Sequence, residues 1–136
     1  MMRIGVIGCG NMAQALVKGI YQSNKETNFF TYTPSHTKAK ELASLVSGEA
    51  VKEIRDFPVL DYWLIACKPQ QFDEFVKNSS GLLRDQKVIS IMAAISIESI
   101  SKKLQTNKVI RIMPNTPVGV GLGICLLVVC EMITPE

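Results

Sequence analysis

The chain has 136 residues, of which 47% are hydrophobic and 20% are charged, and its formal net charge is +3. This length and composition predict one globular domain with a single core. The charge is spread along the chain without an arginine-rich block or a basic stripe. We therefore do not expect nucleic acid as a partner.

Neither a membrane span nor a signal peptide is predicted. The first residues pass directly into a short apolar run and glycines, and the longest apolar stretch, residues 118–130, is short and rich in glycine. The cysteines show neither a C-x-x-C pair nor a zinc spacing. We therefore interpret Cys9, Cys67, Cys125 and Cys130 as reduced core residues of a cytoplasmic protein with no membrane partner.

Short apolar runs alternate with helical patterns along the chain. Residues 3–8 predict a buried strand, and residues 11–22 a helix with Met12, Leu16 and Ile20 on one apolar face. Residues 28–33 predict the second strand, and residues 35–46 a helix with Ser35 as a possible N-cap. Further strands are predicted at residues 50–54, 61–67, 87–92 and 108–113, and further helices from residue 71 and, capped by Ser96, over residues 96–104.

This alternation predicts an α/β fold of the Rossmann type, a doubly wound and mostly parallel sheet in a single domain over residues 1–136. Ligands of such sheets bind beyond the carboxyl ends of the strands. The segments "GCGN", "TPS", "CKPQ", "AAIS" and "MPNTP" all follow predicted strands, so they share that edge. In the last of them, Pro114 and Pro117 hold Asn115 and Thr116 in a fixed conformation on the ligand side.

A glycine motif follows the first strand. The segment "IGCGNMA" has the pattern G-x-G-x-x-A, with Gly8 for the tight turn, Gly10 for close approach of a pyrophosphate and Ala13 for close helix packing. The motif follows a strand and opens a helix whose first amides can bind phosphate. This context favours dinucleotide binding over a merely structural turn.

The second strand ends without an acid. An acid there would bind the ribose 2′-hydroxyl of NAD, but residues 27–40 contain neither Asp nor Glu. Hydroxyls and cations, with Thr33, Ser35 and Lys38 foremost, suit a 2′-phosphate instead, so NADPH is favoured and NADH stays the alternative. His36 is interpreted as a surface residue.

Small residues follow two later strands. Ala66 and Cys67 let a dinucleotide ribose lie against the backbone, and "MAAIS" offers small residues where the nicotinamide half passes. Lys68 is either a phosphate or ribose contact or a solvated side chain. The sequence contains no Ser-His-Asp set, paired buried carboxylates or metal-ligand cluster, and hydride transfer needs none, because the cofactor carries the chemistry.

Together, "GVIGCGNMAQALVKG", "ACKPQ", "SIMAAISIESI" and "RIMPNTPVGVG" resemble the pyrroline-5-carboxylate reductases, in the order of that family and over nearly the whole chain. The resemblance implies a Rossmann domain that binds NADPH or NADH and transfers hydride to the C=N carbon of 1-pyrroline-5-carboxylate, which gives L-proline. It implies that Asn115, with Thr116 beside it, lies next to the nicotinamide pocket. The resemblance implies cofactor contacts at Ile7, Gly8, Cys9, Gly10, Asn11, Met12, Thr33, Ala66, Cys67, Lys68, Pro69, Met92, Ala93 and Ala94. Ser35 and Lys38, predicted above from the residues after the second strand, complete the set of expected cofactor contacts.

Three departures from the family pattern matter. Ala94 stands where the family usually has glycine, and its methyl would narrow the nicotinamide site if that residue needs a positive φ. Around Glu53 this chain lacks the asparagine that the family often has near the adenosine. Members also carry a helical dimerisation domain that supplies substrate contacts, whereas this sequence stops at "ITPE", as a next helix would begin. Turnover by this chain alone is therefore not expected.

Two other functions remain open at this stage. One is another NADP-linked reductase of the hydroxyacid dehydrogenase type, which shares the same domain. The other is a stand-alone NADP-binding module without catalysis. Of the motifs, only "MPNTP" discriminates the first of these from a pyrroline-5-carboxylate reductase.

Overall fold

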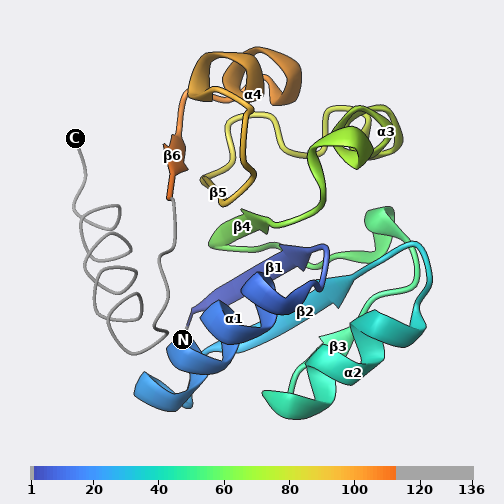
Figure 1. Ribbon diagram of the computed structural model, residues 1–136, viewed down its shortest axis with the longest axis vertical. Coiled ribbons are helices and arrows are strands. Elements are labelled where there is room, and N and C mark those ends of the chain that lie inside the picture. Colours follow the sequence, from blue (N-terminus) through green and yellow to red (C-terminus); the bar gives the residue numbers. More distant parts are fainter. Residues whose placement is uncertain (1, 113–136) are drawn as a thin grey trace.

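The computed structural model describes residues 2–112, which form a six-stranded sheet covered by helices (Figure 1). The strand order is β3-β2-β1-β4-β5-β6, and every pair of neighbours is parallel. The predicted fold class is thus confirmed, and the sheet is fully rather than mostly parallel. The strands are β1 (Arg3–Ile7), β2 (Asn28–Tyr32), β3 (Glu49–Ala50), β4 (Tyr62–Ile65), β5 (Val88–Ser90) and β6 (Val109–Arg111).

Helices cover both faces of the sheet because each parallel connection needs a crossover. One core cluster joins β1 and β2 to α1 and α2 through residues such as Val17 and Leu42. The other joins β4 and β5 to α3 and α4 through residues such as Phe72 and Ile100. The helices are α1 (Asn11–Ser23), α2 (Thr37–Leu45), α3 (Pro69–Ser79) and α4 (Ile97–Leu104), with a 3-10 turn, η1, at Ile54–Asp56.

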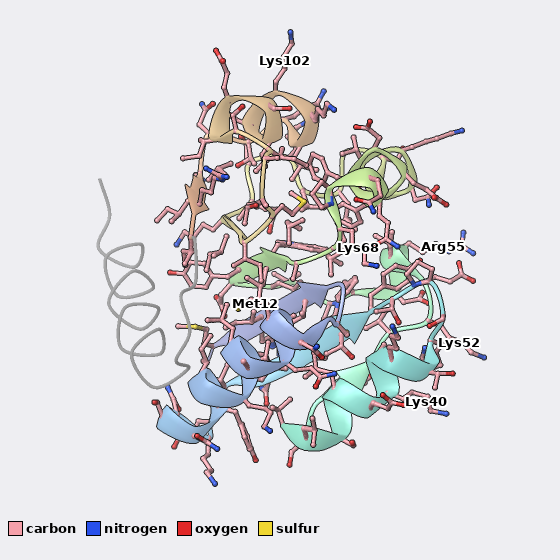
Figure 2. The ribbon with its side chains drawn as sticks, in the orientation of Figure 1. Met12, Lys40, Lys52, Arg55, Lys68 and Lys102 are labelled. Atoms are coloured by element: carbon pink, nitrogen blue, oxygen red, sulfur yellow. The ribbon has the colours of Figure 1, made fainter. Side chains whose placement is uncertain are left out.

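The apolar face of α1 is offset from the predicted one. Leu16 and Ile20 are buried as expected, but Met12 is 40% exposed, so its assignment to the core face was wrong (Figure 2). The buried positions are Ala13, Leu16, Val17, Gly19 and Ile20. Ala13, the last position of the glycine motif, is buried, as expected where the helix of such a motif packs closely on its strand.

The two predicted N-caps had different outcomes. Ser96 caps α4, because its hydroxyl oxygen accepts the Ser99 amide at 3.1 Å. Ser35 does not cap α2, which begins two residues later at Thr37. The hydroxyl of Thr33 serves instead and accepts the Ala39 amide at 3.2 Å, because the chain turns at residues 34–36 and brings the end of β2 over the helix start.

The edge strand predicted at residues 50–54 is shorter and lies earlier in the chain. β3 comprises only Glu49–Ala50 and pairs with β2, and η1 follows it. Within residues 2–112, no helix is long and apolar enough to cross a membrane, and no cluster of metal-ligating side chains is present. Cys125, Cys130 and all other residues of 113–136 for which predictions were made lie outside the described residues.

Candidate functional site

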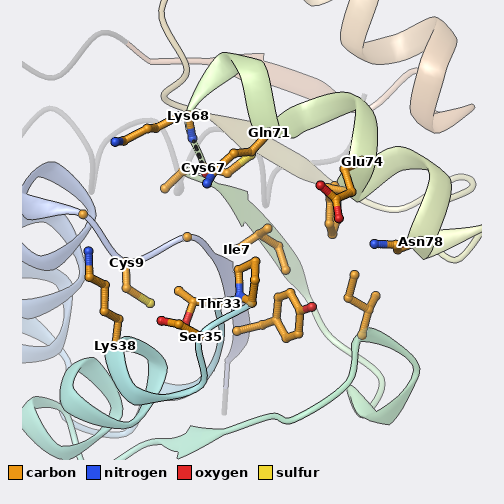
Figure 3. A pocket seen from close by; sticks show the side chains of 17 residues that line it. Ile7, Cys9, Thr33, Ser35, Lys38, Cys67, Lys68, Gln71, Glu74 and Asn78 are labelled. Atoms are coloured by element: carbon orange, nitrogen blue, oxygen red, sulfur yellow. Dashed lines mark hydrogen bonds between the residues drawn. The ribbon is translucent and has the colours of Figure 1, made fainter.

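A cavity of about 330 Å³ lies at the carboxyl edge of the sheet, where the strand order reverses between β1 and β4 (Figure 3). The ends of β1, β2 and β4 open into it, together with α2 and α3. This is where the topology predicts a ligand. The cavity is lined by Ile7, Gly8, Cys9, Gly10, Tyr32, Thr33, Pro34, Ser35, Lys38, Ile54, Ala66, Cys67, Lys68, Gln71, Glu74, Phe75 and Asn78.

The glycine turn has two glycines with opposite surroundings. Gly8 has a φ of +93°, and a Cβ added to it would lie 2.7 Å from backbone atoms of Ala66 and Cys67. A Cβ added to Gly10 would meet nothing within 4 Å. Gly8 therefore permits the turn and its contact with the end of β4, whereas Gly10 leaves open space on the cavity side. That space is what a pyrophosphate lying against this backbone would need.

The start of α1 leaves its amides available. No side chain caps the helix, and its first turn contains no acid. The amides at a helix N-terminus bind anions, and the helix dipole adds to the attraction. The glycine turn lines the cavity, and the uncapped helix start that follows it is suited to bind an anion there.

Hydroxyls and a cation lie at the end of β2. Ser35 and Lys38, which the sequence predicts to contact a 2′-phosphate, are exposed and line the cavity. Thr33 also lines it but is only 7% exposed, and its oxygen already accepts the Ala39 amide. Its hydroxyl hydrogen is still free to be donated, so Thr33 combines a structural contact with a possible ligand contact.

The far wall of the cavity is a face of α3 that sequence reasoning missed. Gln71, Glu74, Phe75 and Asn78 recur at helical spacing and line the cavity. The helix is positioned at its start, where the Lys68 amide donates to the Gln71 side chain at 3.2 Å (Figure 3). The 3.6-residue period counted from Pro69 could have identified this face, since "CKPQ" was already placed at the ligand edge.

Both described cysteines line the cavity as free thiols. Burial raises the pKa of the Cys9 thiol to about 12, although the positive charge of Lys38 lowers it in part. Burial likewise raises the pKa of Cys67 to about 11, against a backbone hydrogen bond that lowers it. The Cys67 sulfur lies 3.8 Å from that of Met92. Both thiols are neutral near pH 7, so they act as small apolar wall groups.

Not every predicted site residue lines this cavity. Met92 is 2% exposed and lies behind Cys67, and Ala94 has a φ of +66° in the turn after β5. The positive φ anticipated for Ala94 is therefore present. Asn115 and Thr116 lie outside the described residues. Those in the described part that do not line the cavity are Asn11, Met12, Pro69, Met92, Ala93 and Ala94.

A second cavity, of about 310 Å³, continues the site beyond β2. It shares Tyr32, Ile54 and Asn78 with the first and adds Lys52, Glu53 and Arg55. Arg55 and Glu53 form an exposed ion pair at 2.9 Å, which contributes little to stability. The sequence around Glu53 lacks the asparagine that the family often has there. At this end of the site an amide side chain is instead supplied by Asn78 of α3.

Comparison with known proteins places the chain in a family. The sequence pattern of the family described as "NADP oxidoreductase coenzyme F420-dependent" matches residues 3–94, which include the glycine turn, the end of β2 and α3. The chain belongs to this family. NADP as the cofactor class, predicted from residues 27–40, is thereby confirmed at the level of the family.

The resemblance to pyrroline-5-carboxylate reductases is also confirmed. The enzyme of that name from Escherichia coli (strain K12) is 31% identical over 141 residues, with 98% of this chain and 52% of that protein covered. Pyrroline-5-carboxylate reductase 2 of Bacillus subtilis (strain 168) is 33% identical, with 88% and 45% covered. The structure of a pyrroline-5-carboxylate reductase from Coxiella burnetii superposes with a TM-score of 0.75 at 26% identity, over 86% of this chain and 45% of that one. The chain spans about half the length of the relatives it matches.

Proposed function

We propose that the chain is the NADPH-binding domain of a pyrroline-5-carboxylate reductase. The observation that carries the proposal is the cavity at the reversal of strand order, with the open side of Gly10 at one wall and Ser35 and Lys38 at another. The first suits a pyrophosphate, and the second suits a 2′-phosphate. The similarity to reductases of this name over 98% of the chain supports the same function.

In this proposal the chain's residues bind and orient the dinucleotide. The amides at the start of α1 hold the pyrophosphate, and Lys38 and Ser35 hold the 2′-phosphate. Ala66 and Cys67 give the ribose a flat wall. NADPH, when bound, supplies the hydride that converts 1-pyrroline-5-carboxylate to L-proline.

Cofactor binding is tested by calorimetric titration of the 136-residue chain with NADPH and with NADH. We expect tighter binding of NADPH, and an affinity that falls as salt rises, because the 2′-phosphate contact is electrostatic. Absence of binding, or a clear preference for NADH, would contradict the assignment of Ser35 and Lys38.

We further propose that this domain does not complete the substrate site. The chain spans 52% of the Escherichia coli relative, and we assign the groups that hold the substrate carboxylate and ring to the remaining half of such proteins. Orientation of the two reactants lowers a barrier by about 7 kcal/mol or more, so a domain without those groups should turn over slowly or not at all. We assign the formation of a dimer or a higher oligomer to the same half. The cytoplasmic location is part of this proposal and is supported by the free thiols of Cys9 and Cys67.

A steady-state assay distinguishes the proposed function from the alternatives. The 136-residue chain should reduce pyrroline-5-carboxylate far below about 1 per second, and a version extended by the second half of a relative should be active. In the extended protein, Asn115→Ala should lower turnover more than NADPH affinity. Fast turnover by the short chain would refute the division of labour. An extended protein that binds NADPH without reducing the imine would favour the binding module or a reductase with another substrate.

A further inference from the structure

The cavity has charges of opposite sign at its two sides. Lys38 and Lys68 lie on one side with Ser35, whereas Glu74 and Asn78 lie on the other (Figure 3). Both members of the second pair come from α3, one helical turn apart, and both line the cavity. No hydrogen bond or ion pair within residues 2–112 engages the Glu74 carboxylate or the Asn78 amide, so both are available to a ligand.

The surroundings of this pair suit a flat heterocycle. Tyr32 and Ile54 provide aromatic and aliphatic surface to the same part of both cavities, next to Asn78. Burial raises the pKa of Tyr32, and the negative charges of Glu74 and Glu53 raise it further, so the phenol stays neutral. A neutral ring beside an aliphatic side chain favours stacking of a base.

The topology indicates which part of a dinucleotide lies here. In the proposed binding mode the pyrophosphate would lie at the glycine turn, and the ribose that follows it would lie at the end of β2. The base therefore extends past β2 toward η1 and α3. A carboxylate at this end would repel phosphate, but it can accept hydrogen bonds from an exocyclic amine.

We propose, on the basis of the proposed NADPH binding, that Glu74 and Asn78 recognise the amino edge of adenine and make the site selective for that base. The Glu74 carboxylate accepts from the 6-amino group. The Asn78 amide pairs with adenine through one donor and one acceptor, as asparagine does where it reads adenine in nucleic acids. A base with a carbonyl at position 6 would place an acceptor against the carboxylate.

The experiment compares NADPH with its hypoxanthine analogue, in which a carbonyl replaces the 6-amino group and the 2′-phosphate is kept. Dissociation constants are measured for the 136-residue chain and for Glu74→Gln. We expect the unmodified chain to bind the analogue about tenfold or more weakly than NADPH, and Glu74→Gln to bind both within about threefold, because an amide can donate to the carbonyl. The ratio of the two constants cancels any change in phosphate attraction.

Asp73→Asn is the matched control. It removes the same charge from the neighbouring position of α3, where Asp73 pairs with Lys103 at 2.6 Å and does not line the cavity. This variant should keep the full discrimination. If the unmodified chain binds both dinucleotides equally, or Glu74→Gln and Asp73→Asn behave alike, the inference fails while NADPH binding stands. If NADPH itself does not bind, the proposed function fails and the inference with it.

Discussion

The two ends of the cavity are built in different ways. At the glycine turn the backbone makes the site: Gly8 permits the turn, Gly10 leaves space on the cavity side, and α1 begins directly after it without a side-chain cap. At the α3 end side chains make the site, with Glu74 and Asn78 projecting from a regular helix. The glycine end requires that two positions carry no side chain, whereas the α3 end requires particular side chains. Substitutions at the two ends should therefore differ in whether they lower stability or ligand affinity.

The largest effect is expected at Gly8, and it should appear as lost stability. Alanine there combines a φ of +93° with a Cβ placed 2.7 Å from the backbone of Ala66 and Cys67. We expect Gly8→Ala to lower the free energy of unfolding by about 3–5 kcal/mol, measured by denaturant titration. Gly81→Ala is the control, since Gly81 has a φ of +83° and no atom within 4 Å of its added Cβ. Equal losses at both positions would show that contact with β4 is unimportant.

Gly10→Val should abolish cofactor binding and spare the fold. The residue has an extended φ of −73°, which valine adopts readily, and its Cβ meets nothing within 4 Å. The added methyl groups would occupy the space assigned to the pyrophosphate. We expect NADPH affinity to fall by about 100-fold or more, with a melting temperature near that of the unmodified chain. Normal binding by this variant would mean that the glycine turn is only structural.

Lys38→Gln tests the cation after β2, which lines the cavity together with the glycine turn and with the side chains of α3. We expect NADPH affinity to fall about tenfold at low salt and NADH affinity to stay unchanged, because only NADPH carries the 2′-phosphate. Lys40→Gln is the matched control on the same helix, because Lys40 is exposed, does not line the cavity and lies at the periphery of Figure 2. Equal losses for both cofactors would assign Lys38 to the pyrophosphate instead.

The smallest effect is expected at Ala94, whose φ of +66° is one that glycine adopts more easily. Ala94→Gly should raise the free energy of unfolding by about 0.5–1 kcal/mol. The relief of backbone strain in the folded state should exceed the destabilisation that glycine causes by giving the unfolded chain more conformational entropy. Ala93→Gly, at a neighbouring exposed position without a positive φ, should lower it by a similar amount. Thermal unfolding of the pair decides, and the same sign for both would contradict the strain at Ala94.

The sequence by itself predicted the fold class, the edge of the sheet at which the cavity lies and the glycine turn that lines one end of that cavity. These depend on local signals: apolar runs at strand and helix periods, and glycines placed between a strand and a helix. Ser96 was correctly identified as a cap for the same reason, since its partner is only three residues away.

Tertiary structure decided the rest. The oxygen that caps α2 comes from Thr33 rather than Ser35, because the turn after β2 determines which hydroxyl reaches the Ala39 amide. The exposure of Met12 could not be known without the packing of α1 on the sheet. Glu74 and Asn78 became site residues only when the parallel sheet brought α3 opposite the end of β2, more than thirty residues away in the chain. Local patterns fix conformation within a few residues, whereas the side chains that face a shared cavity depend on how distant elements pack.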